Sequence, residues 1–176
     1  SAATVAGTFP ITGAGHTVLG TLTIGAANAS RGTLDPANST QITKAVGTTG
    51  YTFSSIKVTA GSVEKVRVKS IRWNQSGSAS ASDLANITTI VDGVAYPTAV
   101  SADGKYYSTS FGDGIVIDKG LSKDISVKGD VVSGSGRTVD FDIYKTTDLY
   151  VSGETYGFGI TPTATANNTG TSSTSD

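Results

Sequence analysis

Few side chains in this sequence have the types and spacing that chemistry requires. His16 is the only histidine and lies in a leader of small residues, where no buried carboxylate is available to orient its imidazole for a Ser-His-Asp relay. Asp140 and Asp142 are two residues apart, about 6–7 Å on a strand. Paired carboxylates can hydrolyse glycosides or bind Ca²⁺. The apolar residues that alternate with them favour solvent-facing positions instead, although calcium binding stays open. The sequence predicts no catalytic residue, no metal site and no cofactor.

The asparagines form a second group with potential chemistry. Five of the six precede a Ser or Thr at the second following position, the acceptor pattern for N-glycosylation. These glycosylation candidates are Asn28, Asn38, Asn74, Asn86 and Asn167. The alternative is that Asn simply accompanies Ser and Thr in loops. Whether any of the five carries a glycan is left open by the sequence.

The composition favours strands and turns over helices. Ser and Thr occupy 49 of the 176 positions beside 22 Gly, and charged residues make up 15%, against about 25% in an average soluble protein. The net charge is −1, and the densest basic run places Lys65, Arg67 and Lys69 two residues apart. Such spacing is typical of the solvated face of a half-buried strand. Nucleic-acid binding, which needs clustered cations, is not expected.

The chain has the features of an exported protein. It contains no cysteine, which excludes a disulfide framework and thiolate metal sites. No apolar run approaches the roughly 18 residues of a membrane helix. The Ser-Ala-Ala start suits the mature side of a signal-peptidase cut. We therefore expect an extracellular, cell-surface location without membrane insertion.

The elements that position these residues are short strands separated by turns. A strong two-residue hairpin signal, Asp92-Gly93, separates two of them, and a β-bulge near Ser70 would bring Ile71 and Trp73 to the same face as Val66 and Val68. Trp73 is expected in the core. The pattern predicts an all-β, immunoglobulin-like antiparallel β-sandwich of about nine or ten short strands. Eleven segments are candidates for these strands: 17–24, 50–60, 62–74, 84–91, 94–100, 106–111, 115–117, 121–132, 139–144, 149–151 and 156–160.

Three regions are expected. Residues 1–16 form an extended leader, residues 17–160 the sandwich, and residues 161–176 a Ser/Thr/Asn-rich tail or linker. The only sizeable apolar residues of the leader are Val5, Phe9 and Ile11. Phe9 and Ile11 can face one way on an extended chain, and the proline between them fits an edge or an added strand. The leader is therefore a candidate donor strand for a neighbouring subunit.

The order of strand and turn phrases between 52 and 160 resembles a known module. The phrases are Ile56–Glu64, Gly77–Asn86, Leu121–Asp130 and Arg137–Tyr144. They are similar to the immunoglobulin-like β-sandwich module of large predicted surface and S-layer-like proteins from uncultivated small-genome bacteria. The resemblance covers about two thirds of the chain and implies an extracellular module in an envelope or filament. In those proteins the module is often embedded in much longer chains, so this chain is either a whole subunit or a fragment.

Two functions follow as hypotheses. The first is a non-enzymatic structural subunit of an extracellular filament, pilus-like fibre or surface layer, whose partners are copies of itself joined by strand exchange. The alternative is an adhesin or carbohydrate-binding surface module that contacts a host surface or polysaccharide through exposed tyrosines. The candidate tyrosines are Tyr106, Tyr107, Tyr144, Tyr150 and Tyr156.

Overall fold

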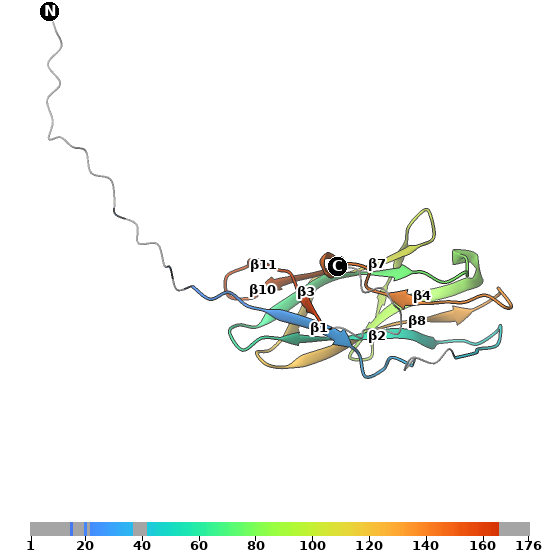
Figure 1. The fold of residues 1–176 in the computed structure, drawn as a ribbon, viewed down its shortest axis with the longest axis horizontal. Helices are drawn as coiled ribbons and strands as arrows, with labels where there is room; N and C mark the ends of the chain where they lie inside the picture. The colour runs from blue at the N-terminus through green and yellow to red at the C-terminus, as the bar shows by residue number, and fades with distance from the viewer. Residues whose placement is uncertain (1–14, 16–19, 21, 37–41, 166–176) are drawn as a thin grey trace, which may run out of the picture.

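The computed structural model describes residues 15, 20, 22–36 and 42–165, and these form an all-β fold of two packed sheets (Figure 1). The predicted sandwich is thus confirmed. Twelve strands are found in the described residues rather than nine or ten, because four of them are two-residue pairings. The strands are β1 (Ala27–Arg31), β2 (Tyr51–Ala60), β3 (Val66–Gln75), β4 (Leu84–Val91), β5 (Val94–Pro97), β6 (Ala99–Val100), β7 (Tyr106–Ile117), β8 (Ser122–Val131), β9 (Phe141–Asp142), β10 (Leu149–Gly153), β11 (Gly159–Ile160) and β12 (Thr163–Ala164).

The strands divide evenly between two antiparallel-rich sheets. One has the order β12-β1-β2-β8-β4-β5, and the other has the order β11-β10-β3-β7-β6, with β9 paired to the end of β3. The single parallel pairing among the described strands joins β1 to β12. Two short 3₁₀ turns, η1 (Ala81–Asp83) and η2 (Thr146–Asp148), precede β4 and β10.

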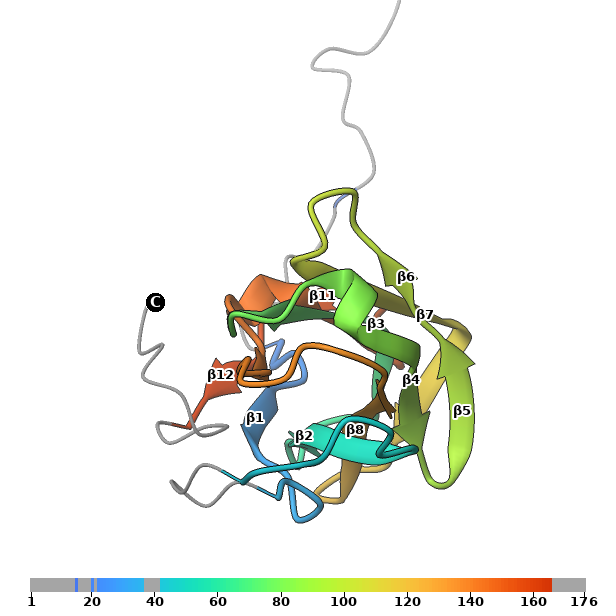
Figure 2. The same ribbon diagram turned by 90° about the vertical axis from the view of Figure 1, so that its right-hand side faces the viewer.

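One crossing segment runs along each lateral edge of the sandwich. On one side β5 pairs with β4 and β6 pairs with β7, so residues 94–100 pass from the first sheet to the second. On the other side β11 pairs with β10 and β12 pairs with β1, so residues 159–164 pass in the opposite direction. Figure 2 shows the two segments on opposite sides of the barrel-like section. β12 also extends the sheet into the region expected to be tail.

The core confirms the predicted bulge. Val66, Val68, Ile71 and Trp73 are all at most 1% exposed, and the pairing of β3 with β7 shifts register between Val68 and Ser70. The bulge adds one residue to β3 and so shifts the in-out alternation by one position. Ile71 and Trp73 therefore point to the same interior face as Val66 and Val68. The face of Lys65, Arg67 and Lys69 points outward, and its cations contact Asp118, Glu154 and the Asp113 carbonyl oxygen.

The first strand differs from expectation. Gly20 and residues 22–24, the described part of the predicted strand 17–24, are not strand, and β1 instead begins at Ala27 in the expected loop. Its residues Ala27 to Arg31 pair in continuous register with Ala60 to Ile56. Strand formation here depends on that partner, because strand preference is set largely by the surrounding sheet rather than by the local apolar pattern.

The sandwich has two distinct ends along its length (Figure 1). Backbone hydrogen bonds join the β2–β3 turn to residue 26, to 120–121 and to 154, and we call this the Glu64 end, comprising residues 22–26, 61–65, 118–121 and 154–158. The other end contains residues 32–36, 42–50, 76–83 and 132–140. We call it the groove end, because it holds the cavity with apolar walls described below.

Candidate functional site

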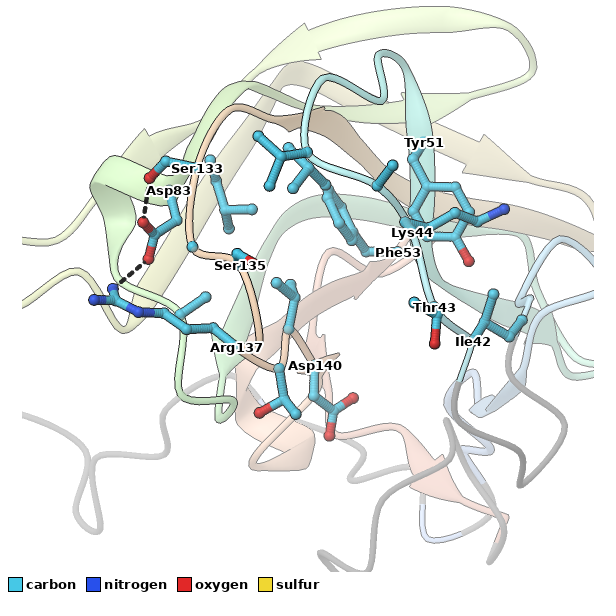
Figure 3. Close-up of a pocket in the computed structure, with 18 of the residues that line it drawn as sticks. Ile42, Thr43, Lys44, Tyr51, Phe53, Asp83, Ser133, Ser135, Arg137 and Asp140 are labelled. Atoms are coloured by element: carbon cyan, nitrogen blue, oxygen red, sulfur yellow. Dashed lines mark hydrogen bonds and ion pairs between the residues drawn. The ribbon is translucent and has the colours of Figure 1, made fainter.

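A cavity of about 680 Å³ opens at the groove end. One wall comes from residues 42–46 and the start of β2, and the opposite wall comes from the segment that carries the chain from β8 to β9 (Figure 3). Apolar side chains supply much of the lining: Ile42, Val46, Tyr51, Phe53, Leu84, Val131 and Val139. This cavity, which we call the groove, is therefore suited to binding a chain segment with apolar side chains, or with both apolar and polar ones, rather than a small charged ligand.

Asp83 connects two loops at one edge of the groove. Its carboxylate accepts hydrogen bonds from Ser133 Oγ at 2.5 Å, from Ser80 N and Oγ at 2.8 Å, and from Arg137 Nη1 at 2.6 Å. These bonds, that from Ser133 foremost, hold the pKa of Asp83 far below its usual value. The Asp83 side chain is 4% exposed and its oxygens are occupied by these donors, so its role is to tie the 80–83 and 133–137 loops together.

Aromatic rings line the other wall. Tyr51 meets Phe53 edge-on at 5.4 Å between ring centroids, and Phe53 lies 5.5 Å from the core residue Phe141. Lys44 Nζ sits 4.7 Å from the Tyr51 ring centroid. Burial, with the charge of Asp35, raises the pKa of Tyr51 above its usual value, so the ring stays neutral at physiological pH. The two rings thus extend the aromatic packing of the core into this wall.

A second, more polar cavity of about 690 Å³ lies between residues 76–82 and 101–106. Serine hydroxyls, Asn74, Asp103 and the ring of Tyr106 line it, and Arg72 covers the Tyr106 ring at 4.8 Å from its centroid. Gln75, which is 6% exposed, also borders the cavity, and its Nε2 has no hydrogen-bond partner. The lining offers hydrogen-bonding groups together with one aromatic ring.

The predicted site residues differ in whether the structure describes them and in how exposed they are. The leader residues Val5, Phe9 and Ile11 lie outside the described residues, as do His16, Asn38 and Asn167. Asn86 is exposed in a left-handed conformation with φ of 52°, and its Nδ2 donates to Asp130 at 2.7 Å. Asn28 and Asn74 are half-buried in β1 and β3, and the Asn28 amide donates to Thr163.

The expectation that Asp140 and Asp142 both face solvent is wrong for Asp142, which is 3% exposed. β9 lies where the chain crosses from β8 in one sheet to the other, so both of its faces are covered, and the neighbouring Phe141 is also buried. Asp140 is half-buried and accepts a hydrogen bond from Ser76 Oγ. Within 22–36 and 42–165 no three acidic or histidine side chains gather closely enough to hold a metal ion.

The predicted tyrosine surface is only partly present. Tyr107 is 1% exposed and packs edge-on against Phe141, so it cannot contact a ligand. Tyr106 is half-buried beside Arg72. Tyr144, Tyr150 and Tyr156 are exposed, and Tyr156 belongs to the Glu64 end. The structure does not bring the five rings together as one stacking platform.

Glu64 is a site residue that the sequence did not reveal. It is 2% exposed at the Glu64 end, where its carboxylate accepts backbone hydrogen bonds from Gly25 and Thr155. Its signal in the sequence was weak, since an acid next to a strand is normally solvated. The residues of this end include six exposed large apolar side chains: Leu22, Ile24, Val63, Leu121, Tyr156 and Phe158.

Comparisons with known proteins do not assign this chain to a family. No protein-family model and no curated protein matches the chain. Among solved structures, the chain is similar to the full-length major pilin RrgB from Streptococcus pneumoniae, with 14% identity and a TM-score of 0.27, over 63% of this chain and 21% of the pilin. The chain thus spans about a fifth of that pilin's length. Within the described residues, no helix has the length and apolarity needed to cross a membrane.

Proposed function

We propose that this protein is a non-enzymatic structural subunit of an extracellular filament, pilus-like fibre or surface layer, and that its partners are copies of itself. The observation that carries the proposal is the placement of exposed apolar side chains at the two ends of the sandwich. Six lie at the Glu64 end, and Leu34, Ile42, Val46 and Val132 lie at the groove end. Single exposed apolar residues are ordinary, but a cluster marks a surface that is covered in use.

Apolar surfaces at opposite ends support a head-to-tail arrangement. When two different surfaces of one molecule meet, the contact repeats from copy to copy and builds an open chain rather than a closed dimer. Burying one exposed leucine or phenylalanine contributes about 1.5–3 kcal/mol. The side chains at the two ends are 39–59% exposed, so covering several of them contributes part of the free energy that association requires.

Strand exchange is the joining mechanism we propose, with the leader around Val5, Phe9 and Ile11 as donor. A suitable acceptor is the crossing segment 94–100, whose exposed residues include Val94, Ala95 and Val100. It carries none of the charged side chains that commonly protect outer strands, although Pro97 within it has no backbone N–H to donate. Backbone hydrogen bonds to this edge would supply affinity, and the alternate leader side chains would supply register.

Electron microscopy of the purified chain tests the proposal. Negative staining is expected to show fibres or sheets, and dispersed particles at high concentration would reject self-assembly. Deleting residues 1–16 is expected to abolish polymers while circular dichroism still reports a β fold. Polymers that survive the deletion would reject strand exchange by the leader.

The polar cavity beside Tyr106 favours one second candidate, an adhesin or carbohydrate-binding module. Hydroxyl and amide groups around one ring form a lining that suits a sugar, and Gln75 Nε2 is a buried donor without a partner. Binding of the chain to a glycan array, abolished by Tyr106→Ala and retained by Tyr150→Ala, would support this function. Dispersed particles that bind glycans would favour it over self-assembly.

A further inference from the structure

Glu64 is enclosed by glycine main chain on two sides. A Cβ atom added at Gly25 would lie 2.6 Å from Glu64 Cγ, and one added at Gly153 would lie 2.4 Å from Glu64 Oε1. Both distances are shorter than any real contact of a Cβ atom. A side chain at either glycine would therefore force the Glu64 carboxylate to move from its present place.

The Glu64 carboxylate joins two distant segments. Oε1 accepts the Gly25 amide at 2.7 Å, and Oε2 accepts the Thr155 amide at 2.8 Å. Gly25 directly follows residues 22–24, which carry the exposed Leu22 and Ile24, and it precedes β1. The point at which the chain reaches the sandwich from the leader side is thus held by one buried side chain.

The charged side chains near Glu64 contact other groups rather than its carboxylate. Lys65 Nζ contacts Asp118 at 2.6 Å, and Arg67 makes a two-pronged contact with Glu154, with Nη2 to Oε1 at 2.5 Å. Lys69 donates to the Asp113 carbonyl oxygen. Among the described residues Glu64 makes no ion pair, and its carboxylate accepts hydrogen bonds from the backbone amides of Gly25 and Thr155 and from the Thr155 side chain. The bond to the Gly25 amide is therefore a direct contact between the Glu64 carboxylate and the 22–25 segment.

We propose that Glu64 is the positioning residue that docks the main chain of residues 22–25 onto the Glu64 end, and that it releases this segment when it takes up a proton. A neutral acid has a hydroxyl group in place of one acceptor oxygen, so it can no longer serve both amides equally well. The interaction is charge-assisted, which makes it stronger than an ordinary amide–carbonyl bond.

The direction of the pH dependence follows from the surroundings. Burial raises the pKa of Glu64, but the amides of Thr155, Gly25 and Tyr156 lower it more, so the folded pKa lies below the usual value of 4.5. A carboxylate with a depressed pKa contributes stability above its unfolded pKa and loses that contribution as the pH falls through the folded pKa. The segment is therefore docked at neutral pH and released in acid, below pH 4.5.

The consequence that docking by Glu64 has for assembly rests on the proposed function. If the leader is the donor strand, Glu64 sets the place and direction from which the leader departs toward the neighbouring subunit. Docking itself does not need a polymer, because it can be measured on dispersed chains. The experiment can therefore reject docking by Glu64 without rejecting self-assembly, and the reverse.

Amide hydrogen exchange on the full chain tests the docking. In Glu64→Gln at pH 7, the Gly25 and Thr155 amides should lose protection on the order of tenfold or more, because a buried donor loses its charged acceptor. The matched control is Glu154→Gln, which removes an acid from an exposed position next to Thr155 and should leave Gly25 protected. The Val131 amide, bonded to the Thr48 carbonyl oxygen at the groove end, serves as an internal reference.

A pH series and a second variant complete the test. Protection of Gly25, corrected for intrinsic exchange, should fall in acid for the natural chain and stay low and flat for Glu64→Gln. Gly25→Ala, which keeps the carboxylate but crowds it, should show the same loss, whereas Gly20→Ala should not, since nothing lies within 4 Å of a Cβ there. Unchanged protection of the amide at position 25 in both Glu64→Gln and Gly25→Ala would overturn the proposal, and so would an acid response that persists in Glu64→Gln.

Discussion

The indole Nε1 of Trp73 donates a hydrogen bond to Thr89 Oγ1 across the interior of the sandwich, at 3.0 Å. Both residues are fully buried, and they belong to different sheets, Trp73 to β3 and Thr89 to β4. The Thr89 hydroxyl also lies 2.8 Å from that of Thr109 in β7, which lies 2.8 Å from that of Thr98 in the 94–100 crossing. A short polar chain thus joins the two sheets beneath one lateral edge.

Breaking this chain should destabilise the fold. Thr89→Val keeps the shape but leaves the Trp73 donor buried without an acceptor, and we expect the free energy of unfolding in urea to fall by about 1–3 kcal/mol. Thr88→Val, one residue away and half-buried, is the control and should change it by less. If Thr89→Val unfolds at the same urea concentration as the natural chain, the hydrogen bond makes no net contribution.

The Asp83 network should make stability depend on acid. Because the pKa of Asp83 is depressed in the folded state, its contribution is present above pH 4 and is lost as the pH falls toward the folded pKa. Asp83→Asn should therefore lower the free energy of unfolding at pH 7, and the difference from the natural chain should shrink by pH 2.5. Urea unfolding at the two pH values measures this, with the exposed Asp92→Asn as control. A difference that does not change with pH would contradict the assignment.

Gly77 should not tolerate a side chain. A Cβ atom there would lie 2.2 Å from the Thr138 carbonyl oxygen, a backbone atom that can move only if the 138–140 segment separates from residues 76–79. We expect Gly77→Ala to cost about 1–3 kcal/mol of unfolding free energy, as overpacking does. Gly159→Ala is the comparison, since the nearest atom lies 4.0 Å from its Cβ position. Equal melting curves for the two variants would show that the loops can separate freely.

The apolar Glu64 end should be needed for assembly. Leu121→Ser and Phe158→Ser change residues that are 59% and 54% exposed, so the monomer should keep its stability while the polymer yield in sedimentation falls at least tenfold. Tyr150→Ser replaces an equally exposed ring on β10, outside that end, and should assemble normally. Full assembly of the Leu121 and Phe158 variants would exclude this end as a contact between subunits.

If the chain is glycosylated, Asn86 should be modified ahead of Asn28. Asn86 is exposed and only its Asp130 contact must open, whereas the Asn28 amide contacts Thr163 inside the β1–β12 pair. Peptide mass spectrometry of material from the native source measures the occupancy of each site. A glycan at Asn28 with Asn86 bare would contradict this order.

Much of the architecture could be predicted from short-range patterns. The Asp92-Gly93 turn, with both residues at positive φ, the bulge beside Ser70 and the burial of Trp73 all follow from residues close together in the sequence. Alternation of apolar and polar residues decides which face of a strand is buried, and turn residues decide where it ends. The sequence by itself therefore determined an all-β sandwich and most of its strands.

The tertiary structure decided the sites. Glu64 lies 39 residues from Gly25 and 91 from Thr155, and Asp83 lies 50 from Ser133, so their burial and bonding depend on how the sheets stack. The same applies to Asp142, which the alternation pattern placed in solvent, and to Ala27–Arg31, which becomes a strand because β2 pairs with it. Local patterns record what each segment prefers, but burial of a charged group depends on partners that only the folded chain brings together.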